Sequence, residues 1–125
     1  MTQPIQTPHA PAAVGPYSQG IVSGGFVFAS GCLPIDPATS TMVEGTIAEK
    51  ATRALENLKA VAEAGGSSLE KAVKVTVFLA DIADFAEANK VYAEYFKEPY
   101  PARSAFQVGA LPLGAAIEIE AIFAV

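Results

Sequence analysis

The charged residues of this chain are confined to its middle. No Asp, Glu, Lys or Arg precedes Asp36, and after Arg103 the only charged side chains are Glu118 and Glu120. Burying a charge is costly unless it is paired or solvated. We therefore expect the two ends of the chain to form an uncharged β framework. On it, Arg103 and the two carboxylates are paired, solvated in a cleft, or used for chemistry.

The composition is apolar for a chain without a membrane span. Hydrophobic residues make up 51% of the sequence and charged residues 17%, and the mean hydropathy is +0.33. A membrane span needs about 20 consecutive apolar residues, and proline and glycine repeatedly interrupt the uncharged N-terminal stretch. We therefore predict one domain over residues 1–125, whose excess apolar surface is covered by identical subunits.

Charge and cysteine content argue against several classes of protein. A net charge of −5, with eight basic residues spread along the chain, makes nucleic acid an unlikely partner. The one cysteine, Cys32, excludes an internal disulfide. The N-terminus resembles neither a signal nor a transit peptide, so we expect a cytoplasmic protein without membrane contact. No spaced Cys/His motif or phosphate-binding glycine loop is present, and we predict no metal and no cofactor.

Two segments have the residue spacing of helices. The first follows Thr46-x-x-Glu49, which has the form of a capping box, and is expected to end at Gly65. The second begins within residues 81–84 and ends before Pro99. Its side chains at helical spacing form one stripe, namely Ile82, Phe85, Asn89, Tyr92 and Phe96.

Alternating or β-rich runs predict the strands. They cover residues 17–22, 26–32, 73–79, 103–108 and 117–123, with residues 1–16 irregular and residues 36–40 forming a turn. The element order predicts an α+β fold, in which two helices lie on one face of a mixed β-sheet. Because the strands carry apolar residues on both faces, the second face needs subunits to cover it.

Arg103, Glu118 and Glu120 are the first candidates for chemistry. A guanidinium offers a rigid fork that binds a carboxylate, although Arg103 can equally form a salt bridge at a subunit interface. Glu118 and Glu120 lie two apart on a strand and point to the same face. On an interfacial face one of them would have a raised pKa suited to proton transfer. The alternative is a solvated edge strand.

Four further polar or small residues are weaker candidates. Tyr17 follows a sharp Gly-Pro bend, and Ser30 and Gly31 close a strand. The hydroxyls can orient a small polar substrate, or can make ordinary turn and strand-end hydrogen bonds. Asn89 lies in the apolar stripe of the second helix, and we interpret it as a helix-to-loop hydrogen-bonding group.

Taken together, these segments resemble the YjgF/YER057c/UK114 family, the reactive-intermediate (enamine/imine) deaminases also called RidA. The resemblance extends over essentially the whole chain. The segments that carry it are residues 10–19 (APAAVGPYSQ), 30–37 (SGCLPIDP), 57–59 (NLK), 73–79 (VKVTVFL), 84–92 (DFAEANKVY), 101–104 (PARS), 111–112 (LP) and 117–121 (IEIEA).

The resemblance implies a chorismate-mutase-like (YjgF/L-PSP) fold, a homotrimer, and clefts between neighbouring subunits. It implies that Arg103 anchors the carboxylate of a 2-imino or 2-enamino acid and that Glu118 positions or activates water. Tyr17, Ser30 and Asn89, together with Gly31 beside Ser30, would then lie in or near the cleft.

Two positions depart from the pattern of the family. Cys32 stands where many relatives have Gln, and Ala105 stands where many have Cys. The second departure removes a candidate reactive thiol, which puts any thiol-dependent regulation in doubt. The arginine and glutamate chemistry is unaffected.

The leading hypothesis is hydrolytic deamination of reactive imines and enamines, such as 2-aminoacrylate, to 2-oxo acids and ammonia. The enzyme would be a 2-iminobutanoate/2-iminopropanoate deaminase, a hydrolase acting on C–N bonds. One alternative is a non-enzymatic trimer that binds small ligands or acts as a chaperone. Another is an RNA-directed translation inhibitor or ribonuclease, against which the acidic balance and the single histidine argue.

Overall fold

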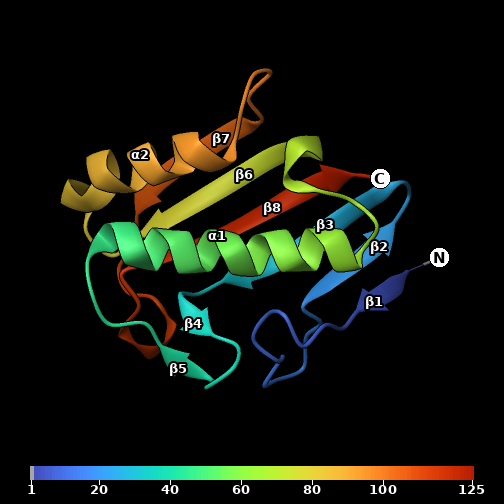
Figure 1. Cartoon of the computed structure of the whole chain (residues 1–125), viewed down its shortest axis with the longest axis horizontal. Coiled ribbons are helices and arrows are strands. Elements are labelled where there is room, and N and C mark those ends of the chain that lie inside the picture. The colour runs from blue at the N-terminus through green and yellow to red at the C-terminus, as the bar shows by residue number, and fades with distance from the viewer. Residues whose placement is uncertain (1) are drawn as a thin grey trace.

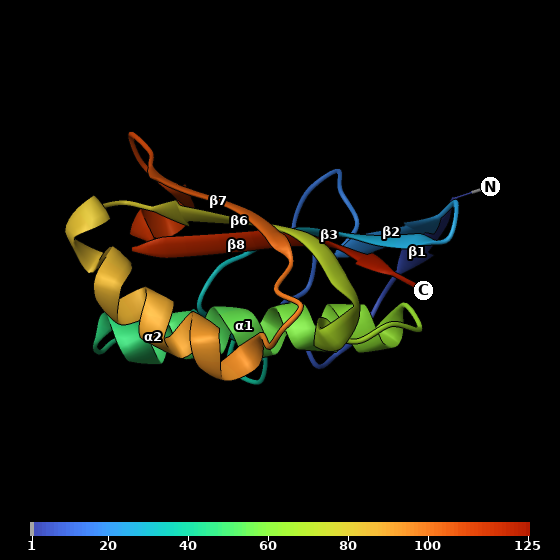
Figure 2. The same cartoon turned by 90° about the horizontal axis from the view of Figure 1, so that it is seen from above.

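The computed structural model describes residues 2–125. Their main feature is a mixed sheet with two helices on one face. Figure 1 shows α1 (Ile47–Ala64) and α2 (Phe85–Tyr95) crossing in front of the sheet. Figure 2 shows that both helices lie on the same side and that neither covers the opposite face, above which only loops rise. The predicted α+β arrangement is therefore confirmed.

The main sheet has six strands in the order β1-β2-β3-β8-β6-β7. All neighbours are antiparallel except β6 and β7, which are parallel because α2 forms the crossover between them. The strands are β1 (Gln3–Ile5), β2 (Gly20–Ser23), β3 (Phe26–Cys32), β6 (Ala72–Leu79), β7 (Ala102–Gln107) and β8 (Ile117–Ala124). A separate small hairpin contains β4 (Ile35–Asp36) and β5 (Thr41–Met42).

The first helix begins and ends as its sequence predicts. The Thr46 hydroxyl accepts a hydrogen bond from the Glu49 backbone N–H, and the Glu49 carboxylate accepts one from the Thr46 N–H, so the capping box is complete. Gly65 is the residue after the last helical turn. The buried side of α1 includes Leu55 and Leu58, which are inaccessible to solvent beneath the sheet.

Strand β8 separates the core from the open face. It lies between β3 and β6, and its odd-numbered residues, Ile117 and Ile119 among them, are buried under the helices. Glu118 and Glu120 alternate with them and therefore point to the face that no helix covers. The same open face exposes aromatic rings, including Phe28 (43% exposed) on β3 and Phe106 (44% exposed) on β7.

The N-terminal region is more regular than predicted. Residues 3–5 form the edge strand β1, paired with β2, where an irregular segment was expected. Pro4 obscures this strand in the sequence, but proline is tolerated on an edge strand because no neighbour needs its N–H. The strand predicted from Tyr17 begins later, at Gly20. No helix within residues 2–125 has the length and apolarity needed to cross a membrane.

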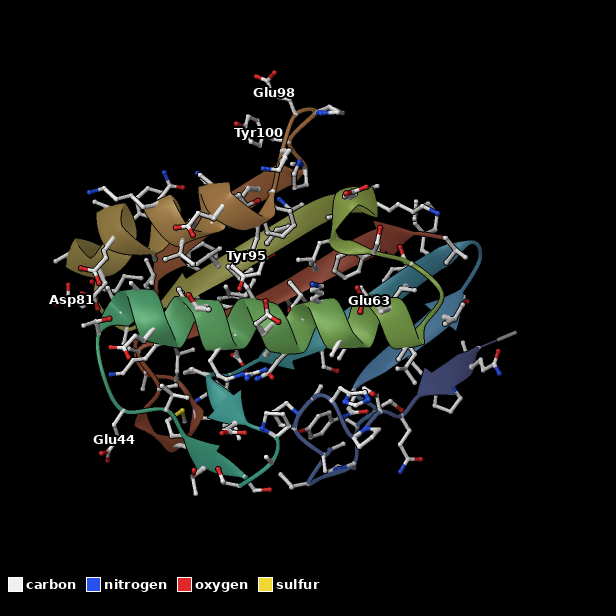
Figure 3. All side chains as sticks on the ribbon, in the orientation of Figure 1. Glu44, Glu63, Asp81, Tyr95, Glu98 and Tyr100 are labelled. Carbon is white, nitrogen blue, oxygen red and sulfur yellow. The ribbon has the colours of Figure 1, made fainter. Side chains whose placement is uncertain are left out.

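The bare aromatic face predicts that the chain self-associates, and the family resemblance makes a homotrimer the expected species. Phe28→Glu should shift the protein toward smaller species in sedimentation velocity, because a charge cannot be buried unpaired at an apolar interface. Tyr100→Glu is the matched control, since the Tyr100 ring is also exposed (60%, against 43% for Phe28) but lies in the loop between α2 and β7, which projects from the body (Figure 3). A wild-type monomer at micromolar concentration would contradict this expectation.

Candidate active site

Arg103 lies on the helix side of the sheet edge. Strand β7 pairs with β6 so that Arg103 is opposite Val75, which is fully buried beneath the helices. The Arg103 Nη1 donates a hydrogen bond of 2.6 Å to Asn89 Oδ1 on α2. The amide of Asn89 thus contacts a strand side chain, and the interpretation of Asn89 as a helix-to-loop group is wrong.

Two aromatic rings of α2 also contact the Arg103 guanidinium. Its central carbon lies 4.7 Å from the centroid of the Tyr92 ring and 5.3 Å from that of Phe85. Both distances fall within the range of attractive cation–π contacts, about 6 Å. These contacts and the amide of Asn89 are all electrically neutral, so they hold the guanidinium without neutralising its charge. The side chain as a whole remains exposed.

Glu118 lies on the opposite face, beside β3. A Cβ placed on Gly31 would lie 2.6 Å from Glu118 Oε2, so only a glycine leaves room for this carboxylate position. On β6, the cross-strand partner of Glu118 is Phe78. Burial first, and the charge of Glu120 second, raise the pKa of Glu118. A carboxylate with a raised pKa is a stronger base, as the sequence suggested for one member of this pair.

Tyr17, Ser30 and Gly31 share a groove with Glu118. The groove has a volume of about 800 Å³, and Leu113 and the N-terminal loop also line it. The Tyr17 side chain is 53% exposed. The Ser30 hydroxyl donates a 2.6 Å hydrogen bond to the carbonyl of Ser18, which is the strand-end role considered as the alternative. Ser30 is therefore fixed, and its oxygen retains lone pairs that can accept a further hydrogen bond.

The structure groups the predicted site residues into two sets on opposite faces. Arg103 and Asn89 lie on the helix face at the β7 edge. Tyr17, Ser30 and Glu118 line the groove that opens on the other face. Because side chains on opposite faces of one sheet cannot meet, a single chain cannot place Arg103 and Glu118 around one small substrate.

The chemistry available to these residues is acid–base and electrostatic. Within residues 2–125 no three His, Cys, Asp or Glu side chains are close enough together to hold a metal ion. Burial, together with the nearby Glu118 charge, raises the pKa of the Cys32 thiol to about 12. This thiol is therefore protonated at neutral pH and is a poor nucleophile.

The sequence did not reveal that the rings of Phe85 and Tyr92 contact Arg103. Both were included in the stripe of the second helix, which reads as a core-facing pattern. The signal was the position of Asn89 within that stripe, because an amide among apolar residues needs a hydrogen-bonding partner. The partner, Arg103, could not be identified until the register of β7 was known.

Comparison with known proteins identifies the family. The family described as Endoribonuclease L-PSP matches residues 7–125. A RutC family protein of Sinorhizobium fredii is 52% identical over 122 residues, covering 98% of this chain and 97% of that protein. The 2-iminobutanoate/2-iminopropanoate deaminase of Bos taurus is 48% identical over 118 residues, covering 94% of this chain and 86% of that protein.

A solved structure agrees with these relatives. RidA from the Antarctic bacterium Psychrobacter sp. superimposes with a TM-score of 0.94 at 49% identity, covering 98% of this chain and 99% of that one. The chain therefore belongs to the L-PSP family, the group that includes the RidA deaminases, and the resemblance seen in the sequence is confirmed.

The close approach of Gly31 to Glu118 yields a prediction. Gly31→Ala should move the Glu118 carboxylate, because the new methyl group would overlap its Oε2. The side chain can rotate away, so the melting temperature should change little. A displacement of about 1 Å can cost roughly 100-fold in rate, and we expect a drop of that order in the deaminase activity proposed below. Gly109→Ala is the control, since a Cβ there meets no atom within 4 Å. Equal activity of the Gly31→Ala variant and the wild type would show that the carboxylate position is unimportant.

Proposed function

We propose that this protein hydrolyses 2-imino and 2-enamino acids, such as 2-aminoacrylate, to 2-oxo acids and ammonia. The observation that carries the proposal is the state of Arg103. The Arg103 side chain is exposed, and its guanidinium is held by an amide and two aromatic rings, so its positive charge is free to bind an anion. An arginine fork fits a carboxylate well. The deaminase name of the relative that is 48% identical supports the same substrate class.

The proposed site requires two copies of the chain. Arg103 and Asn89 of one copy would face the groove of a second copy, which contributes Tyr17, Ser30 and Glu118. Two features of the monomer support this arrangement. The residues that suit one substrate lie on opposite faces, and the open face carries uncovered aromatic rings. A homotrimer with three such clefts satisfies both features.

Within this cleft Arg103 would hold the substrate carboxylate, and Glu118 would act on water. The Glu118 carboxylate accepts a proton from water as its oxygen attacks C2 of the imine. That proton passes to the imine nitrogen, which gives a carbinolamine. The carboxylate then takes the hydroxyl proton and delivers it to the same nitrogen, so that the C2–N bond breaks, ammonia leaves and C2 becomes the ketone carbon. General acid–base catalysis of this kind contributes about 10²- to 10⁴-fold. Fixing the carboxylate beside the base supplies the orientation that the uncatalysed reaction lacks.

The direct test measures 2-oxo acid release from imines formed in situ by an amino-acid oxidase or a PLP-dependent dehydratase. We expect the protein to accelerate release above the rate in its absence, and to do so in proportion to its concentration. Acceleration should also require the assembled oligomer. Tight binding of 2-oxo acids without any acceleration would instead favour a non-enzymatic binding protein.

Removing the Arg103 guanidinium should abolish carboxylate recognition. Arg103→Ala should cost about 2–5 kcal/mol, roughly 30- to several-thousand-fold in kcat/KM, while the oligomer stays intact. Arg103→Lys should rescue poorly, because an ammonium lacks the planar fork. Lys90→Ala is the control, since it removes an exposed positive charge from α2 beside Asn89. Near-full activity of Arg103→Ala would mean that the charge is structural.

The two carboxylates of β8 should differ in function. Glu118→Gln keeps the size and hydrogen-bonding reach of the side chain but removes its acid–base function. It should lower kcat by roughly 10²–10⁴-fold, less where background hydrolysis is fast, with little change in the oligomer. Glu120→Gln, two residues along on the same face, should mainly alter stability or assembly. Kinetics and thermal melts of both variants on one imine decide between them. Our assignment is wrong if Glu120→Gln is the inactive variant and Glu118→Gln behaves normally.

A further inference from the structure

Three side chains of α2 form a cradle for the Arg103 guanidinium. Phe85, Asn89 and Tyr92 occupy positions i, i+4 and i+7, so they lie along one face of the helix. We propose that Tyr92 and Phe85 are positioning residues, which set the orientation of the Arg103 fork so that it receives a carboxylate. This inference rests on the function proposed for Arg103 and assigns the aromatic part of the stripe to that same site.

The contacts constrain the guanidinium in more than one direction. The two ring centroids lie 4.7 Å and 5.3 Å from its central carbon, and Asn89 Oδ1 accepts a hydrogen bond from Nη1 at 2.6 Å. An aromatic face attracts the flat guanidinium, and the amide fixes its rotation in that plane. Only one of its five N–H donors is used in this bond, and the others remain for a ligand.

Tyr92 is itself held rigidly. It is 8% exposed, and its ring centroid lies 4.5 Å from that of Phe96, which is buried in the core at the end of α2. Contacts thus connect the core to Arg103 through Phe96 and Tyr92. Because one side of the Tyr92 ring packs in the core, the ring has a defined position against the charged group.

The ring of Tyr92, and not its hydroxyl, provides this function. The hydroxyl is buried and makes no hydrogen bond within residues 2–125. Burial raises the pKa of Tyr92, so the ring stays uncharged over the working range. A buried hydroxyl without a partner reduces stability. Phenylalanine at this position should therefore preserve the cradle and leave stability equal or higher.

The alternative is that Tyr92 only packs the core. Loss of core packing lowers the melting temperature but has no specific effect on the affinity for a carboxylate. A positioning residue instead changes KM and product affinity while kcat is nearly unchanged, because the water-directing Glu118 lies elsewhere. The change in KM and product affinity, compared with the change in melting temperature, therefore distinguishes positioning of Arg103 from core packing alone.

The test uses Tyr92→Leu, Tyr92→Phe and the control Tyr95→Leu. Tyr95 is on the same helix but donates its hydrogen bond to Glu56 of α1, at 2.7 Å, and points toward that helix (Figure 3). Each variant is measured for KM and kcat on one imine, for 2-oxobutanoate affinity by calorimetry, and for melting temperature. Tyr92→Leu should raise KM and the 2-oxobutanoate Kd by roughly 3- to 30-fold, with kcat within about threefold. Tyr92→Phe should match the wild type, and Tyr95→Leu should lose stability alone.

Arg103→Ala distinguishes failure of this inference from failure of the proposed function. If Arg103→Ala binds 2-oxobutanoate as the wild type does, the proposed function fails. If Arg103→Ala loses binding while Tyr92→Leu retains the wild-type KM and Kd, only the positioning role fails. Impairment of Tyr92→Phe equal to that of Tyr92→Leu would also overturn it. Should Tyr92→Leu not fold, Phe85→Leu decides the matter by the same KM criterion.

Discussion

The alternation of side chains along β8 determines how this protein can function. The strand occupies the middle of the sheet, where one face must seal the core beneath the helices. Ile117 and Ile119 do so, which forces Glu118 and Glu120 onto the open face. A shift of one residue in the register of β8 would bury both carboxylates under α1 and α2 and expose the core side chains. The free energy lost would exceed the folding stability of a domain of this size. The position of the catalytic candidate is therefore tied to the stability of the fold.

The same alternation gives the open face a mixed character. Aromatic rings such as Phe28 favour burial there, whereas Glu118 and Glu120 resist it. Burial and mutual repulsion already raise the pKa of Glu118 in the single chain. Contact with a second copy would supply both apolar cover for the rings and, through Arg103, a positive charge near the carboxylates. Assembly and catalysis would then depend on the same surface, which accounts for the two incomplete sets of residues in one chain.

Local signals in the sequence predicted most of the elements, and non-local pairing accounts for what was missed. Thr46 and Glu49 specify the start of α1 through contacts three residues apart, and the sequence displays them directly. Strand β1 contains Pro4 and is stable only because β2 lies beside it, which no local pattern reveals. Arg103 was identified as a candidate from its isolation, but the face it occupies follows from its pairing with Val75, 28 positions away in a parallel register.

The neutral contacts of Arg103 hold its guanidinium in place without cancelling its charge, which a salt bridge would not do. A guanidinium needs partners to hold it in one orientation, and a carboxylate is the strongest such partner. A carboxylate of the same chain would also neutralise the guanidinium and compete with any anionic ligand. Asn89 is nearly isosteric with aspartate, yet it accepts the same hydrogen bond without a charge. Aromatic faces contribute attraction that is likewise neutral. Arg103 is thereby held in place while its full charge remains available, and this combination suits the binding role proposed for it.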